Sequence, residues 1–392
     1  MLPRSGVRAA GLALFAGLIL SSSGSAAPTP GGAAAGSFVV YVGTFPGANS
    51  KGIYRFSFDA RTGMPSPAVL AAETPKPGMI ALHPNGRFLY AANETDEYQG
   101  KPGGSISAYA IREGGQLDPL NVKASGGPGP CFIAIDPTGR CALVAHYRGG
   151  SVSALPIGPD GRLGDVATLI QHTGAGIDAE RQTHAYAHWI APDPGNRHAL
   201  ACDLGLDKVI CYGFDPATAT LTRNDPPFAR VRPGSGPRHL AFHPNGRWVY
   251  VISEMGSTIT LFSYDGARGS LQEIQTVSTL PDDYAGTSTG AEIAVHPNGQ
   301  FVYGSNRGDD SIVVFAVNRN SGKLKLVQRQ PTLGRTPRGF AIDPTGRWLL
   351  VGNQDADEVR VFQISPDSGR LAPTADAVGI GAPVCFVFLA RR

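Results

Sequence analysis

The sequence predicts an all-β fold, a seven-bladed β-propeller of four-stranded blades, from three observations. A short turn phrase recurs at intervals of 53, 57, 50, 53 and 47 residues, and its six copies begin at His83, Asp136, Asp193, His243, His296 and Asp343. A period near fifty residues around a tight turn is typical of a propeller or a solenoid. Apolar runs flank the copies, and no segment between the turns has a helical period. The two chain ends each contain strands that the other end lacks.

Each repeat contains four antiparallel strands in a fixed order. The proline of the phrase sets φ at the second turn position and a glycine or asparagine permits a positive φ, so the phrase is a hairpin turn. In the second repeat, the apolar runs 131–135 and 141–145 flank the turn and form the first two strands. The alternating run 151–155 forms the third strand, and a stretch that opens on Leu163 forms the fourth. A four-stranded unit of this length is a propeller blade.

The two ends of the chain together supply the seventh blade. Residues 381–387 resemble the first strand of a blade, at 129–133, but no turn or second strand follows them. Residues 38–44 resemble a second strand without a first, and residues 52–56 supply a third. This shared blade closes the ring, which removes the sheet edges that an open array would expose.

The N-terminal residues predict export. Arg4 and Arg8 precede the apolar stretch 9–20, and small residues ending in Ala27 follow it. This pattern is typical of a signal peptide, and the apolar stretch is shorter than a membrane-spanning helix, which disfavours a retained anchor. We therefore predict a cleaved signal peptide at residues 1–27, a disordered Pro/Gly/Ala-rich leader at 28–36 and a single propeller domain at 37–392. The mature protein is expected in the periplasm or outside the cell, without stable membrane insertion and as a monomer.

Charge and cysteine content disfavour several classes of function. The formal net charge is +3 without a basic run or arm, so nucleic-acid binding is not expected. The five cysteines contain no Cys-x-x-Cys pair, which disfavours zinc and redox chemistry. Cys202 and Cys211 flank a short turn and could face each other, so their pairing stays open. We predict neither a metal nor a cofactor.

The repeat also places residues in space. The first strand of each blade lines the central channel, and its start lies at the same mouth as the end of the second strand. Residues at these two positions, with their neighbours, carry charged groups in blades 3 to 6: His188, Arg238, Glu254, Glu292, Arg307 and Arg338. Such asymmetry in a symmetric scaffold predicts a small-molecule site. A set of inter-blade salt bridges is the structural alternative.

The residue types at this mouth predict cofactor-free acid–base chemistry on an anionic, carbonyl-bearing ligand. Guanidinium groups bind carboxylate or phosphate and stabilise a developing oxyanion, and a glutamate near an imidazole can move a proton. No serine nucleophile elbow, Walker loop, Rossmann glycine pattern or His-Glu-x-x-His occurs in the chain. Three histidines open turn phrases and are expected only to hydrogen-bond there. His184 and His188 are four residues apart on an extended segment, so a metal pair is a weak alternative.

Taken together, the motifs are similar to those of a known family. They include Tyr41-Val42-Gly43-Thr44, Gly236-Pro237-Arg238-His239 with Glu254, Ser305-Asn306-Arg307-Gly308 and Pro337-Arg338-Gly339-Phe340. Over residues 38–390 the sequence resembles the seven-bladed propeller lactonases, which include propeller-type 6-phosphogluconolactonase and carboxy-muconate cyclase. The resemblance implies arginines that orient the anionic ligand and proton transfer by a glutamate and a histidine, with catalytic residues His188, Arg238, Glu254 and Arg307. Around them we expect substrate-binding residues at His184, His239, Glu292, Arg338 and Gln354.

The expected function is that of an exported lactone hydrolase whose partner is a small anionic lactone or sugar acid. The resemblance makes 6-phosphogluconolactone the family default. Two alternatives stay open: a muconate-type cycloisomerase that forms a lactone on the same site, and a non-enzymatic propeller that binds a ligand or a protein. Alanine at Arg238 or Glu254 is expected to abolish turnover with little change in melting temperature. A large loss of stability would support the salt-bridge alternative.

Overall fold

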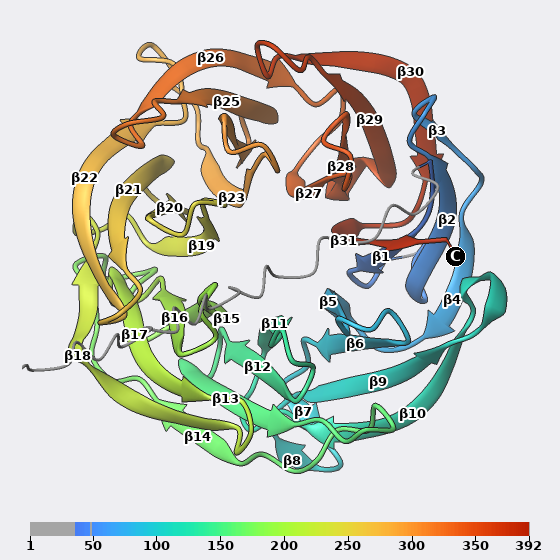
Figure 1. The fold of residues 1–392 in the computed structure, drawn as a ribbon, viewed down its shortest axis with the longest axis vertical. Coiled ribbons are helices and arrows are strands. Elements are labelled where there is room, and N and C mark those ends of the chain that lie inside the picture. The colour runs from blue at the N-terminus through green and yellow to red at the C-terminus, as the bar shows by residue number, and fades with distance from the viewer. Residues whose placement is uncertain (1–35, 48, 392) are drawn as a thin grey trace, which may run out of the picture. The chain divides into compact units, whose positions relative to one another are not determined.

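Seven antiparallel sheets form a closed ring in the computed structural model, which describes residues 36–47 and 49–391 (Figure 1). The all-β prediction is confirmed, since the helical elements in these ranges are two short 3-10 turns, η1 (Glu113–Gly115) and η2 (Gln354–Ala356). No helix described here is long and apolar enough to cross a membrane. The predicted signal peptide, and all but the last residue of the predicted leader, lie outside the described residues.

Six blades each consist of four strands, ordered from the channel outward. Blade 1 contains β5 (Pro77–Leu82), β6 (Phe88–Asn93), β9 (Ser105–Ile111) and β10 (Leu117–Ala124). Blade 2 contains β11 (Pro130–Ile135), β12 (Cys141–His146), β13 (Ser151–Pro156) and β14 (Thr168–Gln171). Blade 3 contains β15 (Ala187–Pro192), β16 (His198–Asp203), β17 (Lys208–Asp215) and β18 (Thr220–Arg230). Blade 4 contains β19 (Pro237–Phe242), β20 (Trp248–Ser253), β21 (Thr258–Asp265) and β22 (Ser270–Ser278). Blade 5 contains β23 (Thr289–Val295), β24 (Phe301–Arg307), β25 (Ser311–Val317) and β26 (Leu324–Pro331). Blade 6 contains β27 (Pro337–Ile342), β28 (Trp348–Asn353), β29 (Glu358–Ile364) and β30 (Leu371–Gly379). Blade 1 also carries a small inserted hairpin, β7 (Glu97–Tyr98) and β8 (Lys101–Pro102).

The two chain ends form blade 7, as predicted. Its inner strand is C-terminal and its other strands are N-terminal, in the order β31 (Pro383–Ala390), β1 (Ser37–Thr44), β2 (Gly52–Asp59), with β3 (Met64–Pro65) and β4 (Val69–Glu73) both pairing with β2. β1 and β31 are antiparallel, with a register that runs from Phe38 opposite Ala390 to Gly43 opposite Cys385. This pairing closes the ring and leaves no unpaired inner strand in the described chain.

Apolar side chains pack between neighbouring blades all the way round the ring. The described residues form seven hydrophobic clusters, and each cluster joins two adjacent sheets. Between blades 4 and 5, for example, Tyr250 and Ile252 of β20 pack with Val302 of β24. Burial of these apolar side chains away from water is the main stabilising contribution to such a ring. Four tyrosine hydroxyls add a polar link by donating to a glycine carbonyl in the outer turn of the next blade: Tyr41, Tyr90, Tyr250 and Tyr303.

The repeated turn phrase links neighbouring blades as well. His83 Nδ1 accepts from the backbone N–H of Asn85 (3.2 Å), and its Nε2 donates to the carbonyl of Gly139 in the next blade (2.9 Å). Gly139 has φ +73°, and a Cβ there would lie 2.2 Å from the His83 ring, so the position requires glycine. His243 and His296 make the same two contacts. The predicted turn role of these histidines is confirmed, with an inter-blade hydrogen bond in addition.

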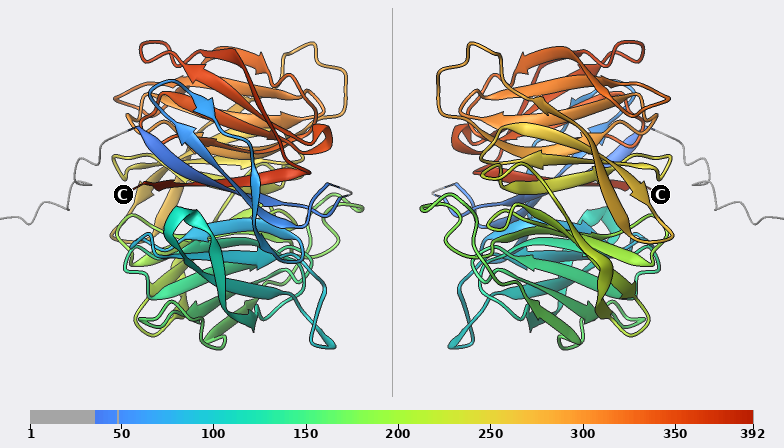
Figure 2. Two further views of the ribbon diagram at one scale, coloured as in Figure 1. Left: turned by 90° about the vertical axis from the view of Figure 1, so that its right-hand side faces the viewer. Right: turned by 90° about the vertical axis from the view of Figure 1, so that its left-hand side faces the viewer.

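All inner strands start at one face of the ring. Figure 2 shows this arrangement edge-on, with the C-terminal end of β31 on one face and the inserted hairpin on the other. The hairpin follows β6, whose last residue, Asn93, pairs with Pro77 at the start of β5. The face that carries the hairpin is therefore the mouth at which first strands begin and second strands end.

Candidate active site

β-Bulges at the start of the inner strands aim a ring of side chains into this mouth. In blades 1 to 6 the register between the first and second strands shifts close to its first pairs. A bulge leaves the extra residue out of the ladder and re-aims its side chain. The residues left out are Gly78, Cys131, His188, Arg238, Ala291 with Glu292, and Arg338. The positions that the repeat places at the start of each channel-lining strand are therefore bulged residues.

A second group of side chains reaches the mouth from the ends of the second strands. Glu94, Tyr147 and Glu254 each follow such a strand directly, and Arg307 is the last residue of β24. The backbone N–H groups of the first three donate to carbonyls just before the first strand of the same blade, at 2.9, 2.8 and 2.7 Å. These backbone bonds bring both groups of side chains to one place.

The two groups enclose a cavity of about 140 Å³ with the walls Glu94, Cys131, Tyr147, His188, Glu254, Arg307 and Arg338. A buried water needs about 10–15 Å³ of such space, so the cavity suits a small molecule of monosaccharide size rather than a polymer. An adjoining space of about 10 Å³ shares Glu94, Cys131 and Arg338 with the cavity. Its other polar walls are Arg238, His239 and Glu292.

Glu254 is the centre of a cluster of three arginines. Its Oε1 lies 2.6 Å from Arg181 Nη2, and its Oε2 lies 2.9 Å from Arg307 Nη2 and 3.3 Å from Arg238 Nε. Only 9% of the Glu254 side chain and 3% of the Arg238 side chain are exposed. Because Arg307 belongs to the neighbouring blade, the cluster is also an inter-blade ion pair. The salt-bridge alternative and the ligand site therefore share the same residues.

The arginines keep Glu254 ionised. Burial alone would raise the pKa of this carboxyl, but the charges of Arg307 and Arg238 outweigh burial and hold its pKa well below the usual range. Both oxygens of this carboxylate are also engaged by guanidinium groups. Glu254 is therefore suited to fixing the arginines in place rather than to taking a proton.

His188 presents a neutral imidazole to the cavity. Burial, together with the charge of Arg238, holds the pKa of this ring well below the usual range. Its Nδ1 is buried and has no hydrogen-bond partner among the described residues, and the ring packs edge-to-face on Tyr147 with centroids 5.4 Å apart. Buried polar atoms without a partner are rare in folded proteins and point to a function. A neutral imidazole in the cavity wall can accept a proton from water.

Arg338 is a cation that no carboxylate of the described residues contacts directly, although its charge acts on Glu94 in the same wall. It makes no ion pair with any carboxylate in the described ranges, whereas Glu94 in the same wall lies 3.8 Å from Lys76. The Arg338 guanidinium lies 4.7 Å from the centre of the Phe45 ring and lines both the cavity and the adjoining space. A guanidinium held on an aromatic ring keeps its planar donors available for a carboxylate or a phosphate. The cavity therefore favours an anionic ligand.

A chain of polar contacts fixes Arg238 from behind. Its Nη1 donates to the carbonyl of Ala291 (2.7 Å) and contacts His239 Nε2 (3.3 Å). Burial, with the charges of Arg238 and Arg338, holds the pKa of His239 well below its usual range, so this ring is neutral. His239 Nδ1 therefore donates to Glu292 Oε1 (3.0 Å). Burial raises the pKa of Glu292 to about 7, so this carboxyl titrates near neutral pH.

Seven of the nine predicted site residues line the cavity or the adjoining space, and two do not. His184 lies on the exposed rim, where its ring packs on Tyr186 with centroids 4.0 Å apart. Gln354 belongs to η2, and its Nε2 donates to Asp355 (3.1 Å). Substrate contact by these two residues stays a prediction, as do the roles of the other seven.

Several residues of the mouth, among them Glu94, Tyr147, Phe45 and Arg181, are absent from the predicted site. Glu94 and Tyr147 occupy the same repeat position as Glu254, so the repeat places them at the mouth, although the predicted site does not include them. Phe45 follows β1 in the shared blade, where no turn phrase marks the position. Arg181 lies on the long connection between β14 and β15, outside any strand, and only the length of this connection could have suggested a function.

The cysteines lack the features of a nucleophile. All five are buried and free, and Cys202 and Cys211 face Val209 and Leu200 across the β16–β17 ladder rather than each other. Cys131 lines the cavity, but burial raises the pKa of its thiol far above the usual range. A thiol with so high a pKa provides almost no reactive thiolate. In the described chain, no three His, Cys, Asp or Glu side chains gather as metal ligands would.

Comparison with known proteins finds relatives over nearly the whole ring. Residues 39–388 match the family described as "Lactonase, 7-bladed beta-propeller". A 6-phosphogluconolactonase of Bacillus subtilis is 36% identical over 304 residues, which are 77% of this chain and 84% of that protein. A 6-phosphogluconolactonase of Formosa agariphila is 32% identical over 311 residues, 77% of this chain and 85% of that protein. The solved structure of the periplasmic gluconolactonase of Pseudomonas aeruginosa is 32% identical with a TM-score of 0.85, covering 90% of this chain and 99% of that one.

Proposed function

Because this chain belongs to the seven-bladed β-propeller lactonase family, we propose that it hydrolyses an aldonolactone, a cyclic sugar ester, at the channel mouth. The observation that carries the proposal is the placement of neutral His188 and unpaired Arg338 around one small cavity. The first supplies a proton acceptor, and the second supplies positive charge for the ligand. The names of the relatives, 6-phosphogluconolactonase and gluconolactonase, support this class of substrate.

In the proposed reaction, water attacks the carbonyl carbon of the lactone while His188 takes one proton of that water. The carbonyl oxygen becomes an oxyanion, and Arg307 and Arg338, both in the cavity wall, stabilise its charge. When the tetrahedral intermediate collapses, the bond from the carbonyl carbon to the ring oxygen breaks and that oxygen receives the proton from His188. The product is an open-chain hydroxy acid, whose carboxyl group releases its proton to the solvent near neutral pH.

Glu254 and Arg238 act as positioning residues in this scheme. Glu254 is ionised and engaged by three arginines, so it orients Arg307 toward the ligand. Arg238 lines the adjoining space but not the cavity itself, and it connects Glu254 to the His239–Glu292 pair. Proton transfer by Glu254, which the family resemblance suggests, is disfavoured because three arginines engage both of its oxygens.

We propose that the protein acts after export and on an unphosphorylated lactone. The signal peptide predicted at residues 1–27 agrees with the periplasmic location named for the Pseudomonas relative. Phosphorylated sugars are made and consumed in the cytosol and are scarce outside it. Among the described residues of the cavity wall, Arg338 is the guanidinium without an ion pair, and its charge is sufficient for the one negative charge of the oxyanion or of the product carboxylate.

A propeller that only binds a partner is less well supported. A docking face for a protein is broad and largely apolar. The mouth of this channel is instead a cavity of about 140 Å³ with charged walls.

Proton release on adding glucono-δ-lactone, with and without the 6-phosphate, tests the proposal. The purified protein is assayed in a pH-stat at pH 7, and the spontaneous rate is subtracted. We expect catalysis that Arg338→Gln reduces strongly and that Arg87→Gln, at a turn outside the mouth, leaves unchanged. A preference for the unphosphorylated lactone would support action after export. A well-folded protein that accelerates neither lactone would refute the proposed reaction.

A further inference from the structure

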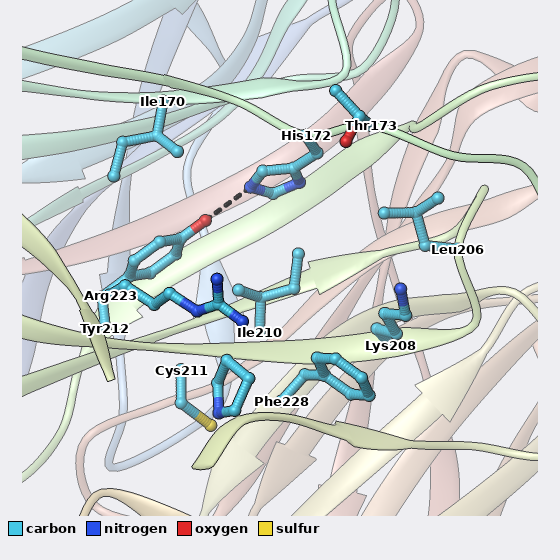
Figure 3. Close-up of a pocket in the computed structure, with 11 residues that line it drawn as sticks. Ile170, His172, Thr173, Leu206, Lys208, Ile210, Cys211, Tyr212, Arg223 and Phe228 are labelled. Atoms are coloured by element: carbon cyan, nitrogen blue, oxygen red, sulfur yellow. Dashed lines mark hydrogen bonds between the residues drawn. The ribbon is translucent and has the colours of Figure 1, made fainter. Parts of the chain in front are cut away.

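The outer strands of blade 3 carry a second hollow, whose lining shares no residue with the channel cavity or its adjoining space. On β18, residues 224–227 bulge opposite a single residue of β17, Cys211, because Tyr212 pairs with Arg223 and Ile210 pairs with Phe228. The strands separate here and leave a pocket of about 230 Å³ against β14 of the neighbouring blade (Figure 3). We call it the side pocket.

The walls of the side pocket are mostly apolar. They include Ile170, Leu206, Ile210, Pro227 and Phe228. His172 and Tyr212 in its wall are already engaged, because His172 Nδ1 lies 2.6 Å from the buried carboxylate of Asp203 and His172 Nε2 lies 2.6 Å from Tyr212 Oη. Figure 3 shows the second of these hydrogen bonds beside the apolar side chains. These walls suit an apolar ligand body and leave neither ring nitrogen of His172 free for catalysis.

Two cations without carboxylate partners flank the apolar part of the side pocket. Figure 3 shows the ammonium of Lys208 and the guanidinium of Arg223 on either side of Ile210. In the described chain neither cation takes part in an ion pair, whereas ten other lysines and arginines do. Lys208 Nζ lies 4.6 Å from the centre of the Phe228 ring, which holds the charge over the pocket wall.

We infer that the side pocket binds a small amphipathic carboxylate. Its hydrocarbon part lies against Ile170, Ile210 and Phe228, and its carboxylate lies at one end of this apolar wall, next to Lys208 or Arg223. Ligand sites commonly combine apolar walls with a few placed polar groups, as this pocket does. The two cations favour an anionic ligand. Because both ring nitrogens of His172 are already hydrogen-bonded, the remaining wall is apolar and suits a hydrocarbon chain. This binding site is separate from the lactone site, so it goes beyond the proposed function.

Octanoate and 1-octanol provide a matched pair of probes, because they share the hydrocarbon chain and differ in the carboxylate. Isothermal titration of the whole protein is expected to show octanoate binding at least about ten-fold tighter than octanol. At least one of Lys208→Gln and Arg223→Gln, the one at the end of the wall that holds the carboxylate, should weaken octanoate up to about five-fold, the range of an exposed ion pair. Both side chains lie at the surface, so the melting temperature should not change. Lys325→Gln, an unpaired exposed cation on the outer strand β26, is the control and should have no effect.

Three results would overturn the inference. The first is the absence of saturable octanoate binding, and the second is equal affinity for octanoate and octanol. The third is octanoate binding that Arg338→Gln abolishes while Lys208→Gln and Arg223→Gln do not affect it, since the anion would then occupy the channel cavity. Lactone turnover plays no part in these measurements, so failure of the proposed reaction leaves the test intact.

Discussion

Replacing Glu254 with glutamine should destabilise the protein as well as reduce its activity, because the amide removes the negative charge that three arginines share. Arg238 is 3% exposed and Arg307 is 15% exposed, so both become largely buried cations without a counter-charge. Removing one partner of a buried ion pair costs about 3–5 kcal/mol. Arg181 is 43% exposed, so the loss of its pairing adds less than about 1 kcal/mol.

The expected change in melting temperature follows from this free energy and from the unfolding entropy, which depends on the size of the ring. A domain of about 350 residues unfolds with an entropy near 0.7 kcal/mol/K, so a loss of about 3–5 kcal/mol lowers the melting temperature by about 4–7 °C. Scanning calorimetry of the wild type and Glu254→Gln at pH 7 measures the difference. The control is Asp118→Asn, which breaks an exposed pair with Arg112 (side chains 48% and 63% exposed) and should change the melting temperature by about 1 °C. A Glu254→Gln protein that melts within 1 °C of the wild type would refute the reasoning.

Three further predictions concern the groups that titrate at the mouth. His188→Asn should lower kcat/KM for the lactone by about 10²–10⁴-fold, the usual contribution of a general base, and undiminished turnover in the pH-stat would exclude His188 as the base. The melting temperature should fall only modestly, because asparagine lacks the buried ring that packs on Tyr147. Glu292 has a folded pKa of about 7 above its ordinary value of 4.5, so its contribution to stability is present below pH 4.5 and is lost as pH rises through 7. Urea unfolding should therefore show a wild type that weakens by up to about 3 kcal/mol relative to Glu292→Gln across this window, and parallel curves would contradict the shift. Glu254 should give the opposite pH dependence of stability, because its folded pKa lies below 4.5. The stability advantage of the wild type over Glu254→Gln should therefore shrink as pH falls below 4.5. An advantage that persists in strong acid would count against the arginine cluster.

The fold was predictable because its information is local and repeated. The turn phrase marks the hairpin between the first two strands of six blades, and the unmatched ends at 38–44 and 381–387 specify the seventh. The same period brought His188, Arg238 and Arg338 to one mouth, since their positions relative to the phrase are equal. The period does not show that these positions are bulges, because a bulge depends on how two strands pair and not on residue type.

The parts of the site that escaped prediction depend on contacts between segments without a shared period. Arg181 reaches Glu254 from a connection that is longer than the equivalent connections of the other blades. His184, four residues before His188, is turned to the rim instead, where it packs on Tyr186. The stability expected for Glu254 variants changes for a similar reason, because the burial of Arg238 beside Glu254 is a property of the folded ring.

A crystal structure of the protein with D-gluconate, the product of the proposed reaction on glucono-δ-lactone, tests the central claim most directly. We expect gluconate in the cavity of about 140 Å³, with its carboxylate within hydrogen-bond distance of Arg338 or Arg307 and next to the His188 ring. Gluconate bound only elsewhere on the ring, or an empty cavity at a saturating gluconate concentration, would contradict the assignment of the channel mouth as the active site.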